Sequence, residues 1–285
     1  MLRKPTGPTR AAKVKQACAT VDAHVKDLAT QMEGGKSEQL LRYLDCCSQF
    51  HQYSFRNIIL AFSQREDLTQ LAGMRQWNKL GRHIRKGEKG IMILAPMSVS
   101  DKRAGQDDPD ARITLFRPVY VFDVSQTEGA ELPDHPRASG DVTLILPALE
   151  ACVRGANITL DYVDDGLDDA DGRSYGGRIA LLAELEPPDK FSVLAHEFAH
   201  EKLHHKGPRE EKTIRETEAE ATAYVVCRHF GVASEASDYL LLYDATPKVL
   251  LERLESVRNT ANDIIDGITA QLTGGCRDER ATAEV

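Results

Sequence analysis

The chain has 285 residues, of which 41% are hydrophobic and 28% charged, a composition typical of a globular protein of about two domains. No apolar run approaches the roughly 20 residues that span a bilayer, and no apolar stretch of the secretory type follows the basic residues 1–5. The six cysteines include no C-x-x-C pair, which favours free thiols in a reducing compartment. We therefore expect no membrane partner and a cytoplasmic location.

Charge is divided unevenly along the chain. Residues 1–100 hold 16 Lys and Arg against 8 Asp and Glu, so 20 basic and 36 acidic residues of the totals of 36 and 44 remain for residues 101–285. A basic first part joined to an acidic second part indicates two functions, with a polyanion as one partner.

The first part of the chain is predicted to combine helices with a small sheet. Residues 1–18 are polar and basic, and we expect them to be disordered. Apolar residues at helical spacing predict the helices, and β-branched and aromatic runs predict the strands. The helices are expected near 21–28, 37–47, 54–64 and 74–81, and the strands at 91–94, ended by Pro96, and at 114–124. A first domain over residues 19–128 follows from these elements.

A polar stretch with Pro and Gly at 129–142 predicts a linker, and a second domain is expected over residues 143–273. Its predicted elements are helices at 146–153, 189–203, 211–230, 235–243 and 247–272 and strands at 158–163 and 178–184. Residues 274–285, which begin with two glycines, are expected to form a flexible tail. The fold class is α+β with two domains.

The strongest motif is His196-Glu197-Phe198-Ala199-His200, an H-E-x-x-H sequence. On a helix, residues four apart point the same way one turn apart, so both imidazoles can bind one Zn²⁺. Glu197 lies beside them and could transfer a proton as a general base in metal-assisted hydrolysis. The sequence therefore predicts a site for one zinc ion with Glu197 as the catalytic carboxylate.

A third protein ligand is required, and a glutamate-rich helical segment begins 15 residues after His200. Glu216 and Glu220 share a face at i, i+4, and we take Glu216 as the ligand and Glu220 as the residue that orients a ligating histidine. Glu218 is expected to be solvated, and the neighbouring histidines His204 and His205 are treated as surface residues. The strand 178–184 could pair with an extended peptide. Four residues are candidate donors to the transition state: Tyr175, Tyr224, His204 and Arg228.

A nucleic-acid signal lies in the first part, where basic residues surround aromatic ones. Basic side chains that follow phosphates and rings that stack on bases are what single-strand binding requires. Buried packing is an alternative for Trp77 and Phe55, which also fit helical core positions. No recognition helix or zinc-finger spacing is present, so we expect no sequence specificity. The candidate DNA-binding residues are Tyr53, Arg56, Asn57, Arg75, Trp77, Lys79, Arg82, Arg85, Lys86 and Lys89.

Four segments of the first part resemble the N-terminal single-stranded-DNA-binding domain of ArdC-type antirestriction proteins: 53–57, 77–82, 85–91 and 121–129. The H-E-x-x-H motif, the segment from Glu216 to Glu220, and Tyr239-Leu240 before a long helix resemble the metallopeptidase domain of the same proteins, which is related to the ImmA/IrrE group. The resemblance covers about residues 20–272. It implies a zincin-like second domain, zinc bound by His196, His200 and Glu216, and protection of a mobile element's incoming DNA from restriction.

Three functions remain open at this point. The chain could bind single-stranded DNA and act in antirestriction, with a zinc metallopeptidase site. It could instead be a DNA-associated endopeptidase that cleaves a specific regulator protein, or it could use the metal only structurally. The residues around 178–184 have sparse polar character, where relatives more often carry an acidic residue and a Met-Pro, and this leaves the peptide substrate open.

Overall fold

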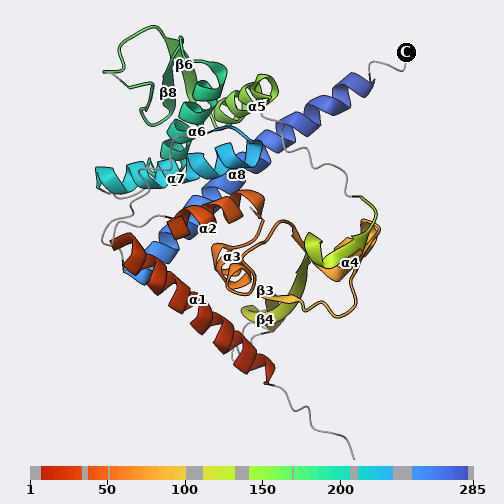
Figure 1. The fold of residues 1–285 in the computed structure, drawn as a ribbon. Helices are drawn as coiled ribbons and strands as arrows, with labels where there is room; N and C mark the ends of the chain where they lie inside the picture. Colours follow the sequence, from red (N-terminus) through yellow and green to blue (C-terminus); the bar gives the residue numbers. More distant parts are fainter. Residues whose placement is uncertain are drawn as a thin grey trace, which may run out of the picture. The chain divides into compact units, whose positions relative to one another are not determined.

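The structure is a computed structural model that describes residues 8–33, 38–50, 52–100, 112–131, 141–168, 170–205, 211–233 and 246–281. The chain forms two compact units (Figure 1). Unit 1 comprises Met1–Asp27 and Arg56–Leu132, and unit 2 comprises Leu28–Phe55 and Pro133–Val285. The α+β class is confirmed, but residues 28–55 pack with the second unit, which differs from the linear division expected from the sequence.

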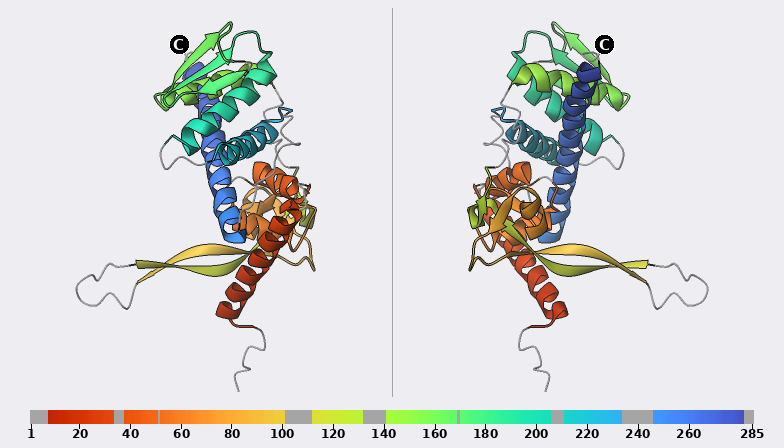
Figure 2. Two further views of the ribbon diagram at one scale, coloured as in Figure 1. Left: turned by 90° about the vertical axis from the view of Figure 1, so that its left-hand side faces the viewer. Right: turned by 90° about the vertical axis from the view of Figure 1, so that its right-hand side faces the viewer.

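Unit 1 is built on a long antiparallel ribbon of two strands, which Figure 2 shows as a twisted pair in yellow and olive. Strand β3 (Ile91–Ser100) pairs with β4 (Arg112–Asp123) along the whole length of β3. Strand β1 (Leu71–Ala72) pairs with the C-terminal end of β4. A second, smaller sheet joins β2 (Arg82–Ile84) to β5 (Thr127–Gly129).

Strand β3 continues through Pro96, so the prediction that Pro96 ends the strand is wrong. The outward backbone groups of this edge strand are bonded by side chains: Gln64 exchanges two hydrogen bonds with Met92, and Asn57 exchanges two with Leu94, at 2.8 and 2.9 Å each. Backbone N–H groups point to alternate sides along a strand, and Pro96 lies two residues after Leu94 and four after Met92. Its backbone nitrogen therefore faces away from β4, as theirs do. A proline at this position removes no hydrogen bond from the β3–β4 ladder.

Helix α1 (Arg10–Glu33) begins inside the segment that was expected to be disordered. The Thr9 hydroxyl accepts the backbone N–H of Ala12 at 3.2 Å, and the residues that follow are good helix formers that bury Ala17. Residues 10–18 are therefore part of the fold, and residues 1–7 lie outside the described part. The other helices of this half are α3 (Phe55–Phe62), α4 (Met74–Lys79) and the 3₁₀ turn η1 (Val124–Gln126).

The core of unit 1 is held by a tryptophan and a buried carboxylate. Trp77 is 0% exposed, and its indole N–H donates to the Phe122 carbonyl at 2.9 Å. Asp123 is also fully buried, and its carboxylate accepts the backbone N–H groups of Thr69 at 2.7 Å, Gln70 at 3.0 Å and Ser125 at 2.9 Å. Although burial raises the pKa of Asp123, these hydrogen bonds outweigh it and lower the pKa overall.

The described residues of unit 2 place helices around a three-stranded sheet. Strand β8 (Arg178–Leu182) lies in the centre, parallel to β6 (Thr159–Val163) and antiparallel to β7 (Gly172–Ser174). The helices are α2 (Glu38–Gln49), α5 (Val142–Gly155), α6 (Pro187–Leu203), α7 (Lys212–Phe230) and α8 (Pro247–Ala281). Helix α8 runs through Gly274 and Gly275, where a flexible tail was expected, since glycine lowers helix stability but does not forbid a helix.

Two predicted segments fall on residues that the structure does not describe. Most of the linker predicted at 129–142 and the whole of the helix predicted at 235–243 lie outside the described residues. Within the described part of the chain, no helix combines the length and apolar character that a membrane span requires.

Helix α2 packs on α7 through polar contacts as well as apolar ones. The Asp45 carboxylate accepts from the Tyr224 hydroxyl at 2.8 Å and from Arg228 Nε at 2.9 Å. Burial and this acceptor raise the pKa of Tyr224 to about 12, so the hydroxyl stays protonated and donates. Residues 28–55 are therefore a structural part of unit 2.

Replacing Trp77 tests whether its ring supports the core. Trp77→Ala should lower the free energy of unfolding by about 3–5 kcal/mol, because it removes a fully buried indole and its hydrogen bond. Arg75→Ala, on the exposed side of the same helix, should change it by less than about 0.5 kcal/mol. Urea unfolding followed by circular dichroism measures both. An equal effect of the two substitutions would contradict the core role of Trp77.

Candidate metal centre and nucleic-acid interface

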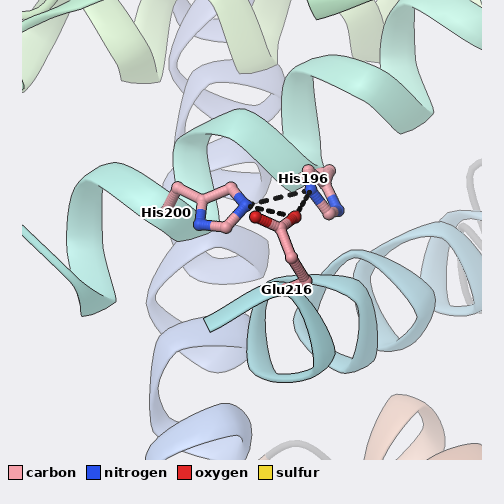
Figure 3. A group of neighbouring side chains, drawn as sticks. All are labelled: His196, His200 and Glu216. Atoms are coloured by element: carbon pink, nitrogen blue, oxygen red, sulfur yellow. Dashed lines mark hydrogen bonds and ion pairs between the residues drawn. The ribbon is translucent and has the colours of Figure 1, made fainter. Parts of the chain in front are cut away.

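Helices α6 and α7 bring the three predicted metal ligands together (Figure 3). His196 and His200 project from one face of α6, as their spacing of four residues requires, and Glu216 approaches them from the first half of α7. The three side chains converge although Glu216 follows His200 by 16 residues in the sequence.

The distances between the three donor atoms fit a single metal ion. His200 Nε2 lies 3.0 Å from His196 Nε2 and 3.2 Å from Glu216 Oε2, and His196 Nε2 lies 3.5 Å from the same oxygen. Ligand atoms about 2.05 Å from a tetrahedral zinc are about 3.3 Å apart, which is close to these separations. Two imidazoles and one carboxylate are also the donor set of a catalytic zinc site, so the residues fit this ion.

Glu220, the residue expected to orient a ligating histidine, lies beside His196. Its Oε2 lies 2.9 Å from His196 Nδ1, which leaves Nε2 directed at the other donors. Burial alone would lower the pKa of His196, but hydrogen bonds to Glu216 and Glu220 raise it to about 9. Hydrogen bonds from both histidines lower the pKa of Glu216 far below its usual range, so this carboxylate is ionised.

Glu197 is buried against the edge strand of the sheet. Its side chain is 8% exposed, and burial raises its pKa, while the charges of His196 and His200 oppose this shift. Ser174 of β7 donates a hydrogen bond to it. A Cβ atom at Gly172 would lie 3.1 Å from Glu197 Cγ and 2.5 Å from Val193 Cγ1. Only glycine at this position therefore lets β7 lie this close to helix α6. A carboxylate whose pKa is raised is suited to accepting and returning a proton.

Three expectations about the surroundings of the site are wrong. Glu218 is not solvated: it is buried, and its Oε1 accepts from Arg253 Nη1 at 2.6 Å. His204 is not a surface residue, since its ring is 5% exposed and lies beside Glu218. Strand β8 cannot pair with a peptide, because β6 and β7 occupy both of its edges.

The candidate transition-state donors are mostly engaged elsewhere. Tyr224 and Arg228 bind Asp45, two and three helical turns beyond Glu216 on α7. Tyr175 is exposed, with the Arg178 guanidinium 5.4 Å from its ring. The turn that follows Tyr175 is held by Glu201, which accepts the backbone N–H groups of Gly176 and Gly177 at 2.8 Å each. This anchor fixes the turn between β7 and β8 to helix α6.

In unit 1, several of the predicted DNA-binding residues have structural roles. The ring of Trp77 is in the core and is not available for stacking. Asn57 binds the backbone of Leu94, and Arg82 donates to Thr127 Oγ1 at 2.7 Å and to the Ala130 carbonyl at 2.5 Å. Arg85 donates to Glu88 and to the Ser125 carbonyl. The contacts of Arg82 and Arg85 stabilise the turns that surround β2 and β5.

The other predicted DNA-binding residues are more accessible. Tyr53 falls in unit 2, where it is half-buried against Phe50, and exposed Arg56 lies 3.9 Å from Asp22. Four basic side chains of the predicted set are exposed and make no hydrogen bond or ion pair to any residue that the structure describes: Arg75, Lys79, Lys86 and Lys89. They are the members of the predicted set that could contact phosphates.

Two exposed aromatic residues of unit 1 are absent from the predicted DNA-binding set. Phe116 is 54% exposed and Tyr120 is 47% exposed, both on β4. Their sequence signal is the aromatic and β-branched run at 114–124, because alternation along a strand places positions 116 and 120 on the same side.

Comparisons with known families match both halves of the chain. Residues 14–122 match the N-terminal domain of anti-restriction factor ArdC, and residues 154–242 match the IrrE N-terminal-like domain of the M78 peptidases. The chain therefore combines a domain that matches the ArdC N-terminal family with a domain that matches the IrrE N-terminal-like family.

One curated relative and two solved structures are similar to this chain. An uncharacterized protein of Bacillus anthracis is 26% identical over 297 residues, which cover 87% of this chain and 50% of that protein. The chain therefore spans about half the length of this relative. The metal-free crystal structure of the antirestriction ArdC protein from the R388 plasmid has a TM-score of 0.52 at 16% identity and covers 89% of this chain and 98% of its own. The Mn(II)-bound structure has a TM-score of 0.46 at 16% identity, with coverages of 81% and 97%.

The metal-free match shows that this chain shares the fold of the R388 protein. The family match to the M78 peptidases covers His196, Glu197, His200, Glu216 and Glu220, so the convergent donors lie inside the peptidase-like domain. The match to the ArdC N-terminal domain begins in α1 and covers α2, although α2 packs in unit 2.

Gly172 offers a test of the packing around Glu197. Gly172→Ala should lower the free energy of unfolding by about 1–3 kcal/mol, because the added methyl group would overlap Val193 and press on Glu197. Gly155→Ala is the control: a Cβ atom added there would have nothing within 4 Å, and we expect no loss and a gain of up to about 1 kcal/mol. Urea unfolding compares them. A neutral Gly172→Ala would mean that β7 does not depend on this close approach.

Proposed function

We propose that the chain is an antirestriction protein that binds single-stranded DNA through unit 1 and holds one zinc ion at a metallopeptidase site in unit 2. It would act in the cytoplasm and protect the incoming DNA of a mobile element from restriction. The zinc site is supported by the convergence of His196, His200 and Glu216, whose donor atoms lie 3.0–3.5 Å from one another. The match to the ArdC N-terminal domain and the exposed basic residues support the DNA half.

His196, His200 and Glu216 would hold the ion, and Glu220 would keep His196 in the tautomer that binds it. When bound, zinc supplies Lewis-acid polarisation of a carbonyl group and makes water more acidic. Glu197 would accept a proton on its carboxylate and return it to the leaving amine, with Ser174 holding the carboxylate in position. A peptide is the substrate class we propose for this reaction.

Strand β7 is the element that could position such a peptide. It lies at one edge of the sheet and pairs with β8 alone among the described strands, and its residues Gly172 and Ser174 contact Glu197. An extended peptide added to this edge would pass beside the catalytic carboxylate. Because Glu201 fixes the turn after β7, this edge is held in place before a substrate arrives.

The DNA half predicts a strong dependence of affinity on salt. If the four exposed residues Arg75, Lys79, Lys86 and Lys89 each neutralise one phosphate, affinity for a single strand should fall about 50-fold between 50 and 200 mM salt. Fluorescence anisotropy of a labelled oligothymidylate, titrated with the full chain, measures this. A flat salt dependence, or a tenfold preference for the same length of duplex, would contradict the proposal.

Glu197→Gln tests how the two halves contribute. We expect this variant to keep one zinc per chain, because Glu197 is not among the three converging donors, whereas His196→Ala should lose the ion. Any hydrolysis of casein by the wild type should fall by about 100-fold or more in Glu197→Gln. Elemental analysis of purified protein and casein cleavage are the measurements, with His83→Ala as a control for loss of a histidine far from the site in the sequence.

Protection of DNA distinguishes the proposal from a regulator-cleaving endopeptidase. If binding of the strand protects it, Glu197→Gln should protect an unmodified plasmid in a restricting host as well as the wild type does. Loss of protection with unchanged DNA affinity would replace this proposal by the endopeptidase alternative. Absence of zinc from the wild-type protein would remove the metal half altogether.

A further inference from the structure

The ribbon of β3 and β4 carries an exposed aromatic face. Positions 116, 118 and 120 lie on one side of β4, because side chains alternate along a strand. This side therefore presents Phe116, Pro118 and Tyr120, and the register places Pro96, Leu94 and Met92 directly opposite them. The rings of Phe116 and Tyr120 are both about half exposed, and four residues of strand separate them by about 13 Å.

A cation lies beside one of these rings. Lys13 Nζ, in the first turn of α1, donates to the Tyr120 hydroxyl at 2.9 Å and lies 5.5 Å from the centre of its ring. Arg10 of the same turn donates to Met97 Sδ at 3.3 Å, but Met97 pairs with Leu115 and therefore belongs to the opposite side of the ribbon. The only acidic residue in the two strands is Asp123, which is fully buried and bonded to backbone N–H groups. The aromatic face thus combines exposed rings with a basic side chain.

We propose that this aromatic face of the ribbon is a stacking platform for bases of single-stranded DNA, with Phe116 and Tyr120 each taking one base. This inference rests on the proposed function and locates its DNA contact. Rings that stack on bases beside cations that meet the backbone are the two components of single-strand binding. The burial of Trp77 strengthens the assignment, because the ring expected to stack is in the core while these two are exposed. A purely apolar partner would not require the Lys13 cation beside Tyr120.

The strand itself supplies a matched control. Leu115 is 46% exposed and adjoins Phe116, but it points to the opposite side of the ribbon. Phe116→Ala and Tyr120→Ala should each weaken binding of an oligothymidylate of about 16 nucleotides by about tenfold, whereas Leu115→Ala should change it by less than about twofold. Phe116→Leu should weaken binding as Phe116→Ala does, because an aliphatic side chain keeps apolar contact but cannot stack. Circular dichroism of each variant establishes that the fold is retained.

A fluorescence measurement reports stacking directly. The chain has one tryptophan, Trp77, which is fully buried and should not respond to DNA. In Phe116→Trp the new indole should be quenched by the oligothymidylate, with a midpoint equal to that of the anisotropy titration. In Leu115→Trp the new indole should not be quenched.

The outcomes separate this inference from the proposed function. If the wild-type chain does not bind the oligonucleotide, the proposed DNA function fails, and this inference fails with it. If the wild type binds with a steep salt dependence but Phe116→Ala and Tyr120→Ala bind equally well, only the stacking platform is overturned. Unchanged DNA binding together with a change of oligomeric state in sedimentation would show instead that the ribbon contacts a second copy of the chain.

Discussion

The alignment of α6 with α7 is the constraint on which the candidate metal centre depends. Its three donors come from two helices, so a rotation of one helix by a single residue, about 100°, would turn Glu216 away from the histidines. The residues next to the motif explain why the helices can lie close together, because Ala195, Ala199 and Ala219 are all fully buried. Larger side chains there would separate the helices, and donor atoms that now lie 3.0–3.5 Å apart could no longer share one ion.

Much of this site could be predicted from the sequence because helical spacing decides it. Residues four apart share a face in any regular helix, so the pairing of His196 with His200, and of Glu216 with Glu220, does not depend on the rest of the fold. The contact between Glu220 and His196 followed from the same spacing together with the need to orient a ligating imidazole. The α+β class and most helices followed from apolar periodicity in the same way.

The features that the sequence did not reveal depend on partners distant in the chain. The polar side chain of Glu218 suggested solvent exposure, but Arg253 on α8 pairs with it in the interior. Strand β8 was expected to have a free edge for a peptide, but β6 and β7 flank it and place it in the centre of the sheet. Pro96 read as a strand end because the sequence does not show that its nitrogen faces away from β4. In each case the sequence indicates the local preference, and a neighbour in the folded structure determines the environment that the residue or strand finally has.

The position of α2 determines how the two proposed activities can be separated by experiment. The match to the ArdC N-terminal domain includes α2, but Asp45 on this helix binds Tyr224 and Arg228 on α7, the helix that also carries Glu216. Cutting the chain after residue 130 would therefore remove the partner of α2 and expose buried Leu40 and Leu44, while the remaining fragment would lose a helix from its core. A loss of function in either fragment would reflect this damage as much as the missing activity. Substitutions at exposed positions of the full chain avoid it, because they leave the core of both units unchanged.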